Sequence, residues 1–199
     1  MPTESTPDPV SQLEHDHVHM SQLVDDLRGL VNAADLNALS ADQHTLLLDT
    51  LTALHDDLLV HFAQEEEGLF PFSLAICQTR GQRIAQILAT HDGLCGSVGR
   101  MLSIAQRGLE HFNTSRAAFA ALFRRFDESY VSHARDECAF LRSLHPRLDN
   151  DRRNQLLQLL DELLPLRTVW VRCRRESLSP SLSPPVHRRI GSAPLPSWA

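Results

Sequence analysis

Four long stretches of the chain repeat apolar residues at the three- and four-residue spacing of one helix face, and they begin near residues 10, 41, 82 and 115. Ser40 is expected to cap the second stretch, because Gln43 three residues later completes a capping box. Gly68 and Pro71 are expected to end that helix, and Pro146 to end the fourth. Four amphipathic helices with short connections predict an all-α fold, an up-down-up-down four-helix bundle.

The segments that flank the predicted bundle differ from it in composition. Residues 1–9 contain three prolines and are predicted to be a flexible leader, so the bundle is assigned to residues 10–146. Residues 147–175 include a leucine-rich stretch, which predicts a short extra C-terminal helix against one end or side of the bundle. Residues 176–199 are rich in proline and serine and predict a disordered basic tail.

Charge and cysteine usage limit the possible partners and location. The net charge of -6 argues against a nucleic-acid partner. Residues 1–166 contain 13 Arg against 24 acidic residues, so the body is acidic. The sequence has neither a signal peptide nor an apolar run long enough for a membrane span. The four cysteines show no paired spacing, which favours a reducing, cytoplasmic location with free thiols.

Polar residues interrupt the apolar face of all four predicted helices. Each face includes one histidine, and two faces add a glutamate one turn later; the six residues are His17, His61, Glu65, His91, His133 and Glu137. A buried imidazole or carboxylate without a partner costs several kcal/mol, and burying the two as an ion pair is seldom net stabilising. A bound cation would remove this cost, so the six residues are the predicted metal ligands.

The other histidines provide an internal comparison. A single histidine on an apolar face is usually a hydrogen-bonded core residue, so the prediction depends on the coincidence across four helices. His15 and His19 lie two residues before and after His17 and therefore face away from the predicted core. His44, His55, His111 and His187 have no carboxylate one turn later.

Imidazole nitrogen and carboxylate oxygen are ligands that suit iron, manganese or zinc. Four histidines and two glutamates are enough for two metal ions, each with two imidazoles and both sharing the carboxylates. A solvent-derived oxygen bridge would leave room for one exogenous molecule. We therefore expect two Fe ions with a bridging oxygen, while zinc and manganese remain alternatives.

These motifs resemble those of the hemerythrin-like, HHE cation-binding family over about residues 10–145. The resemblance rests on Asp16-His17, on His61-x-x-x-Glu65-Glu66 running into Leu69-Phe70-Pro71, on His91, and on His133-x-x-x-Glu137. It implies a four-helix bundle whose non-haem diiron centre binds oxygen, nitric oxide or peroxide. The same six residues are the ligands that the resemblance implies.

The sequence departs from the oxygen-carrying hemerythrins at Cys95, where those proteins have a second histidine one turn after the helix-three ligand. The missing ligand implies a more open and more reactive site. Cys95 is interpreted as a core residue or a thiol near the metal, and Tyr130 as a packed aromatic or a group near the metal. Glu66 or Glu67 is a candidate acceptor for a ligand histidine.

Two functions of different classes follow from the sequence. In the first, the chain binds or reacts with a small oxidant, namely O2, NO or H2O2, at the diiron centre. In the second, it is a metal- or oxygen-sensing module without turnover, in which occupancy changes the stability of the bundle and the basic tail reports it to a partner.

Overall fold

A computed structural model describes residues 8–163, and all of its regular elements are helical. The α-helices are α1 (Pro9–Leu36), α2 (Ala41–Gln64), α3 (Phe70–Ile76), α4 (Gly81–Ala105) and α5 (Leu109–Leu144). Three short elements join or extend them: the π-helical turn η1 (Glu65–Leu69) and the 3-10 turns η2 (Gln78–Arg80) and η3 (His145–Arg147). Residues 150–163 form a further helix. The predicted all-α class is confirmed.

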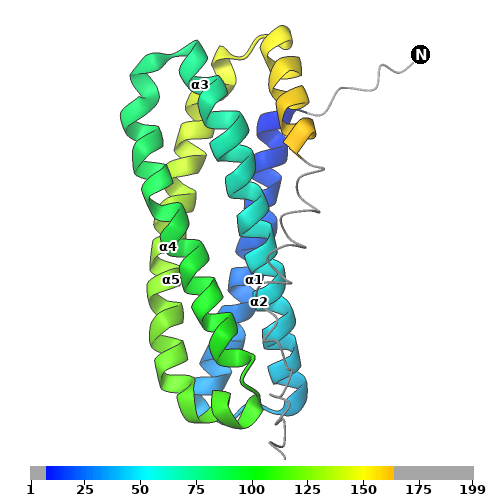
Figure 1. The fold of residues 1–199 in the computed structure, drawn as a ribbon, viewed down its shortest axis with the longest axis vertical. Helices are drawn as coiled ribbons and strands as arrows, with labels where there is room; N and C mark the ends of the chain where they lie inside the picture. Colours follow the sequence, from blue (N-terminus) through cyan, green and yellow to red (C-terminus); the bar gives the residue numbers. More distant parts are fainter. Residues whose placement is uncertain (1–7, 164–199) are drawn as a thin grey trace, which may run out of the picture.

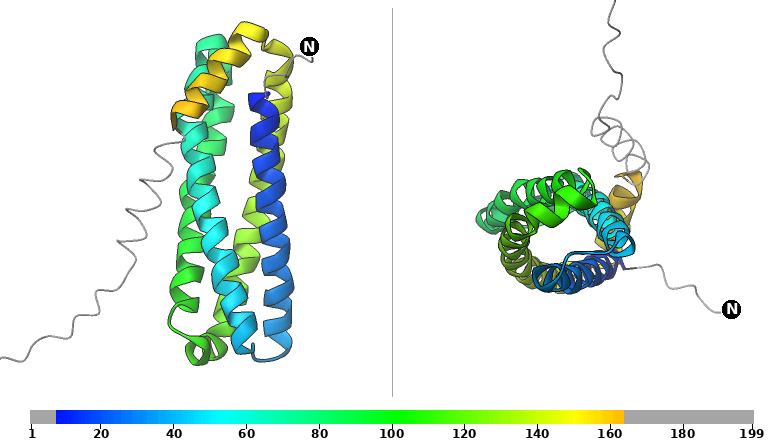
Figure 2. Two further views of the ribbon diagram at one scale, coloured as in Figure 1. Left: turned by 90° about the vertical axis from the view of Figure 1, so that its right-hand side faces the viewer. Right: turned by 90° about the horizontal axis from the view of Figure 1, so that it is seen from below.

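The four long helices α1, α2, α4 and α5 lie side by side along the long axis of the molecule, and the chain reverses direction from each to the next (Figure 1). Helix α1 packs against α2 and α5, and α4 packs against the same two helices. The end-on view in Figure 2 accordingly shows the helices as a closed ring. None of the helices in residues 8–163 is long and apolar enough to span a membrane.

The interior contains two separate apolar clusters. The first core cluster includes Met20, Leu51, Leu58, Met101 and Phe119. The second core cluster includes Leu13, Leu69, Ile87, Phe140 and Leu144. Both are fully buried, as expected of the apolar faces that drive helix packing.

Three of the long helices pass from one cluster to the other at a buried histidine. In α1, Leu13 belongs to the second core cluster and Met20 to the first, and His17 lies between them. Helices α4 and α5 change cluster in the same way around His91 and His133, whereas the helical path after His61 changes cluster only between Phe62 and Leu69 of η1. The polar residues therefore form one layer across the bundle, with apolar packing on both sides.

The predicted cap of the second helix is present. Gln43 N–H donates to Ser40 Oγ at 3.2 Å, and Ser40 N–H donates to Gln43 Oε1 at 3.0 Å. This reciprocal pair satisfies two of the amide groups that a helix N-terminus leaves without partners.

The predicted end of this helix near Gly68 and Pro71 is wrong, because the helical path continues through η1 and α3 to Ile76. At the end of η1 the Phe70 N–H donates to Glu65 O, five residues earlier. A proline lacks an N–H and clashes with the carbonyl four residues before it in a regular α-helix. The wider π turn relieves that conflict and lets Pro71 stand in the first turn of α3.

The last long helix also differs from its predicted start. Helix α5 begins at Leu109, six residues before residue 115, because Gly108 turns the chain with a φ of 97° that other residues rarely adopt. Thr114 lies within the helix, where its hydroxyl donates to His111 O. The helix ends at Leu144, where η3 and Pro146 follow.

The helix over residues 150–163 lies across one end of the bundle (Figure 2). Its Leu156 and Leu160 are buried in the second core cluster. A Cβ atom on Gly68 would lie 3.0 Å from Leu160 Cδ2, so glycine permits the close approach of this helix to the π turn. Most of the predicted leader and all of the predicted tail fall outside the described residues.

Ser40→Ala should lower the free energy of unfolding by about 1 kcal/mol, because the Gln43 N–H loses its side-chain acceptor. Ser40→Asp is the control, since an aspartate oxygen can accept the same bond. Urea denaturation of the metal-free protein measures both, and equal losses in the two variants would contradict the capping role.

Candidate metal centre

The polar layer between the two core clusters contains all six predicted ligands. His17, His61, Glu65, His91, His133 and Glu137 are between 0% and 5% exposed. Helix α1 supplies His17, α2 and its π turn supply His61 and Glu65, α4 supplies His91, and α5 supplies His133 and Glu137.

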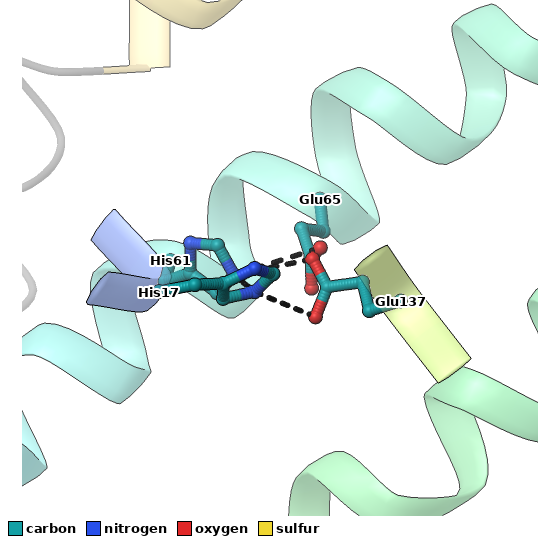
Figure 3. Close-up of side chains that lie close together, drawn as sticks. All are labelled: His17, His61, Glu65 and Glu137. Atoms are coloured by element: carbon teal, nitrogen blue, oxygen red, sulfur yellow. Dashed lines mark hydrogen bonds and ion pairs between the residues drawn. The ribbon is translucent and has the colours of Figure 1, made fainter. Parts of the chain in front are cut away.

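The first group of ligand atoms comes from His17, His61, Glu65 and Glu137, and these atoms all lie within 4.8 Å of one another. His17 Nε2 is 2.9 Å from Glu137 Oε2. His61 Nε2 is 3.3 Å from Glu137 Oε1 and 3.6 Å from Glu65 Oε1. Figure 3 shows the two imidazoles on one side and the two carboxylates facing them.

The second group comes from Glu65, His91 and His133, again within 4.8 Å. His91 Nε2 is 3.5 Å from Glu65 Oε2, and His133 Nε2 is 3.0 Å from Glu137 Oε2. Glu65 therefore belongs to both groups, and Glu137 reaches from the first group to a histidine of the second.

The atoms that face this centre lack hydrogen-bond partners. Apart from the contact between these two carboxyl groups, no group among residues 8–163 donates a hydrogen bond to the buried oxygens of Glu65 and Glu137, and Nε2 of His91 and His133 is likewise buried without a partner. Each unpartnered buried polar atom costs about 1–3 kcal/mol. In addition, His17 Nε2 and His61 Nε2 face each other at 2.8 Å, so a proton or cation is needed to offset the repulsion of two nitrogen lone pairs. A cation would satisfy all of these atoms, and the donor set fits one.

Hydrogen bonds on the outer side of two rings leave their inner nitrogens available. The Thr90 hydroxyl donates to Ile87 O at 2.7 Å, so His133 Nδ1–H donates to Thr90 Oγ1 at 2.9 Å. His91 Nδ1–H donates to the Glu66 carboxylate at 2.7 Å. In both rings Nε2 then carries a lone pair aimed at the centre, which is the usual arrangement of metal-binding histidines.

The outer partners on the other two rings are weaker. Cys138 Sγ lies 3.9 Å from His17 Nδ1, and Asp16 Oδ2 lies 4.0 Å from His61 Nδ1. Thr90 and Cys138 are not among the residues that the sequence singled out, although each is the chain neighbour of a predicted ligand. Only the crossing of α4 and α5 brings Thr90 to His133.

Aromatic packing closes one side of the second group. The Phe62 ring stacks on His91 with centroids 3.8 Å apart and meets the edge of His133 at 5.3 Å. Phe62 is itself buried in the first core cluster. This contact restrains both imidazoles and excludes water from that side of the centre.

The two carboxyl groups of the metal-free centre differ in protonation. Burial raises the pKa of Glu65 well above its ordinary value, and the nearby Glu137 carboxylate raises it further. Burial alone would also raise the pKa of Glu137, but the hydrogen bond from Glu65 and the neighbouring histidines hold it well below its ordinary value. Glu65 therefore retains a proton that it donates toward Glu137. A cation that binds here displaces that proton.

His91 is held in the form that binds metal. Burial and the neighbouring His133 together lower the pKa of His91 to about 3. A neutral imidazole at physiological pH has the free lone pair that a metal ion requires.

Cys95 and Tyr130 occupy core positions. Cys95 is half-buried and packs against the first core cluster. The Tyr130 hydroxyl is hydrogen-bonded with Ser21 Oγ at 3.2 Å, and its ring stacks on Phe126. Burial raises the pKa of Tyr130 to about 12, so this hydroxyl stays neutral.

A bundle of four long helices that encloses a layer of buried histidines and glutamates defines a cation-binding helical protein. The model of the hemerythrin HHE cation binding domain matches residues 8–139, and the chain belongs to this family. Neither the curated proteins nor the solved structures include a match. The family implies cation binding, and the buried histidines and glutamates are a cluster that could hold a metal ion.

The raised pKa of Glu65 predicts a pH dependence of stability. The folded metal-free protein keeps a proton on Glu65 that the unfolded chain loses above the ordinary value of 4.5. Its free energy of unfolding should therefore fall as pH rises above that value. Glu65→Gln retains an N–H donor at every pH and should lose this dependence, while Fe2+ should raise its melting temperature less than that of the wild type.

Thermal melts of both proteins over a pH series, with and without Fe2+, provide the comparison. Parallel pH profiles for the two metal-free proteins would show that Glu65 is ionised in the folded state.

Proposed function

We propose that the chain is a non-haem diiron protein that binds or reacts with a small oxidant, namely O2, NO or H2O2. The observation that supports it is the pair of ligand groups that share Glu65. Two neighbouring donor groups with a carboxylate in common are the arrangement that a dinuclear centre requires, because a shared carboxylate offsets the repulsion between two cations.

The six residues would hold two ions. His17 and His61 would hold the first, His91 and His133 the second, and Glu65 and Glu137 would be shared. The pair of irons supplies redox chemistry with small oxygen- or nitrogen-containing molecules when it is bound. In hemerythrin oxygen carriers a further histidine stands at the position of Cys95, and a thiol packed in the core leaves the second ion with fewer protein ligands.

Residues around the proposed centre limit the access of water and orient the ligand rings. The two core clusters cover the centre along the bundle axis, and Phe62 covers the second group from the side. Thr90 and Glu66 orient the rings of His133 and His91 through their Nδ1 atoms. These contacts give an enclosed site whose nitrogen donors are fixed before any ion binds.

The metal is proposed to be iron because the donor set contains nitrogen and oxygen, and a redox-inert ion would leave the inferred open position without a role. A spectrum of freshly purified protein separates the candidates. An oxygen-bridged ferric pair absorbs in the near ultraviolet and zinc does not, and elemental analysis distinguishes manganese.

A specific contact favours metal or oxygen sensing without turnover as the alternative function. Gly68 belongs to the π turn that begins with Glu65, and Leu160 of the helix over residues 150–163 packs directly on it. If metal binding shifts Glu65, the contact between Gly68 and Leu160 would therefore transmit that shift to this helix. Sensing would be favoured if the iron-bound protein consumes no oxidant while its iron-dependent rise in melting temperature changes when residues 164–199 are removed.

His17→Ala should reduce the rate at which the iron-bound protein consumes H2O2, NO or O2 by more than about tenfold. Mutation of a residue that hydrogen-bonds a metal-ligating histidine already lowers metal affinity or activity by about 10- to 100-fold. This variant removes the ligand itself. His15→Ala is the matched control, because His15 lies two residues away on the same helix and is exposed. Stopped-flow assays with each oxidant measure the rates, and equal rates for the three proteins with every oxidant would refute the proposed reactivity.

A further inference from the structure

A small pocket opens between α1 and α2 beside the proposed metal centre. Its volume is about 50 Å3, which is room for a cation with part of its water shell. Its lining residues are Asp16, His19, Met20, Asp57, Val60 and His61.

The outer part of the pocket contains metal-binding groups that water can reach. The side chains of Asp16 and Asp57 are 32% and 31% exposed, and that of His19 is 57% exposed. His19 Nε2 lies 3.3 Å from Asp57 Oδ2. The two carboxylates at this mouth attract cations and raise their local concentration.

His61, a proposed ligand of the centre, lines the inner part of the pocket. His61 is 2% exposed, and its Nε2 faces Glu65 and Glu137. Its other nitrogen, Nδ1, belongs to a ring that lines the pocket and is buried without a hydrogen bond. Asp16 Oδ2 lies 4.0 Å from this nitrogen. One imidazole thus separates the acidic pocket from the interior.

A cation needs such a route because the proposed ligands are buried. The first core cluster fills the bundle on one side of the polar layer and the second fills it on the other. Moving an ion through apolar packing costs many kcal/mol, whereas carboxylate and imidazole groups can replace its lost water ligands.

We propose that this pocket is the entrance for divalent cations, with Asp16, Asp57 and His19 as transient ligands that deliver the ion past His61 to the buried centre. The inference rests on the proposed function of that centre as a metal site. Among the described residues, the three mouth groups do not form a cluster with ligand atoms within 4.8 Å of one another, as the two buried groups do. Looser spacing suits a site that releases its ion inward.

Rapid mixing of the metal-free protein with Co2+, followed by its visible absorption, tests this route without any redox reaction. Asp57→Asn should slow uptake by about tenfold at low ionic strength, the lower end of electrostatic rate effects, and Asp16→Asn should slow it likewise. The final amount of bound Co2+ and the final spectrum of Asp57→Asn should match those of the wild type, because Asp57 is not among the six proposed ligands of the buried centre.

Asp49→Asn is the matched control, since it removes the same charge from an exposed position of α2 outside the pocket. If Asp57→Asn takes up Co2+ as fast as Asp49→Asn and reaches normal final binding, the proposed entrance is wrong. The proposal of a metal centre would be unaffected by that result. A wild-type protein that binds no Co2+, Fe2+ or Zn2+ would overturn the proposed function and the entrance together.

Discussion

The burial of two carboxyl groups among four imidazoles is the constraint on which this structure depends. Water cannot reach Glu65 or Glu137, and outside this pair their oxygens have no hydrogen-bond partners among the described residues. A proton shared by the two carboxyl groups reduces the cost in the metal-free protein, but it leaves several buried polar atoms unsatisfied. A bound cation would resolve the conflict, and the groups that weaken the metal-free bundle would then provide its binding energy.

The surrounding helices hold this polar layer in place. Apolar clusters on both sides supply the packing that the layer itself lacks, and α1, α4 and α5 each contribute to both clusters. The π turn after α2 carries Glu65 and Glu66 to different partners, one in the centre and one on the outer nitrogen of His91. Such turns are rare and occur often at functional sites, which is consistent with its place here.

The two sides of the centre differ in character. On one side, Phe62 and Phe70 pack around His91 and exclude water. On the other, His61 borders a pocket with acidic groups at its mouth. The centre therefore has dry aromatic packing on one side, where electrostatic interactions are strong, and a polar pocket on another. The helix over residues 150–163 adds a contact to the π turn that the family match over residues 8–139 does not include.

The sequence by itself determined the helical class, the capping box at Ser40 and the six polar residues that interrupt the apolar faces, because these depend on periodicity within a single helix. The tertiary structure decided how the helices meet. The extension of the second helix past Pro71 and the start of α5 at Leu109 follow from the π turn and from Gly108, but only packing brought Thr90 to His133 and Asp16 to His61. Contacts of this kind join residues far apart in the chain, so their distances depend on the packing of whole helices and leave no local pattern in the sequence.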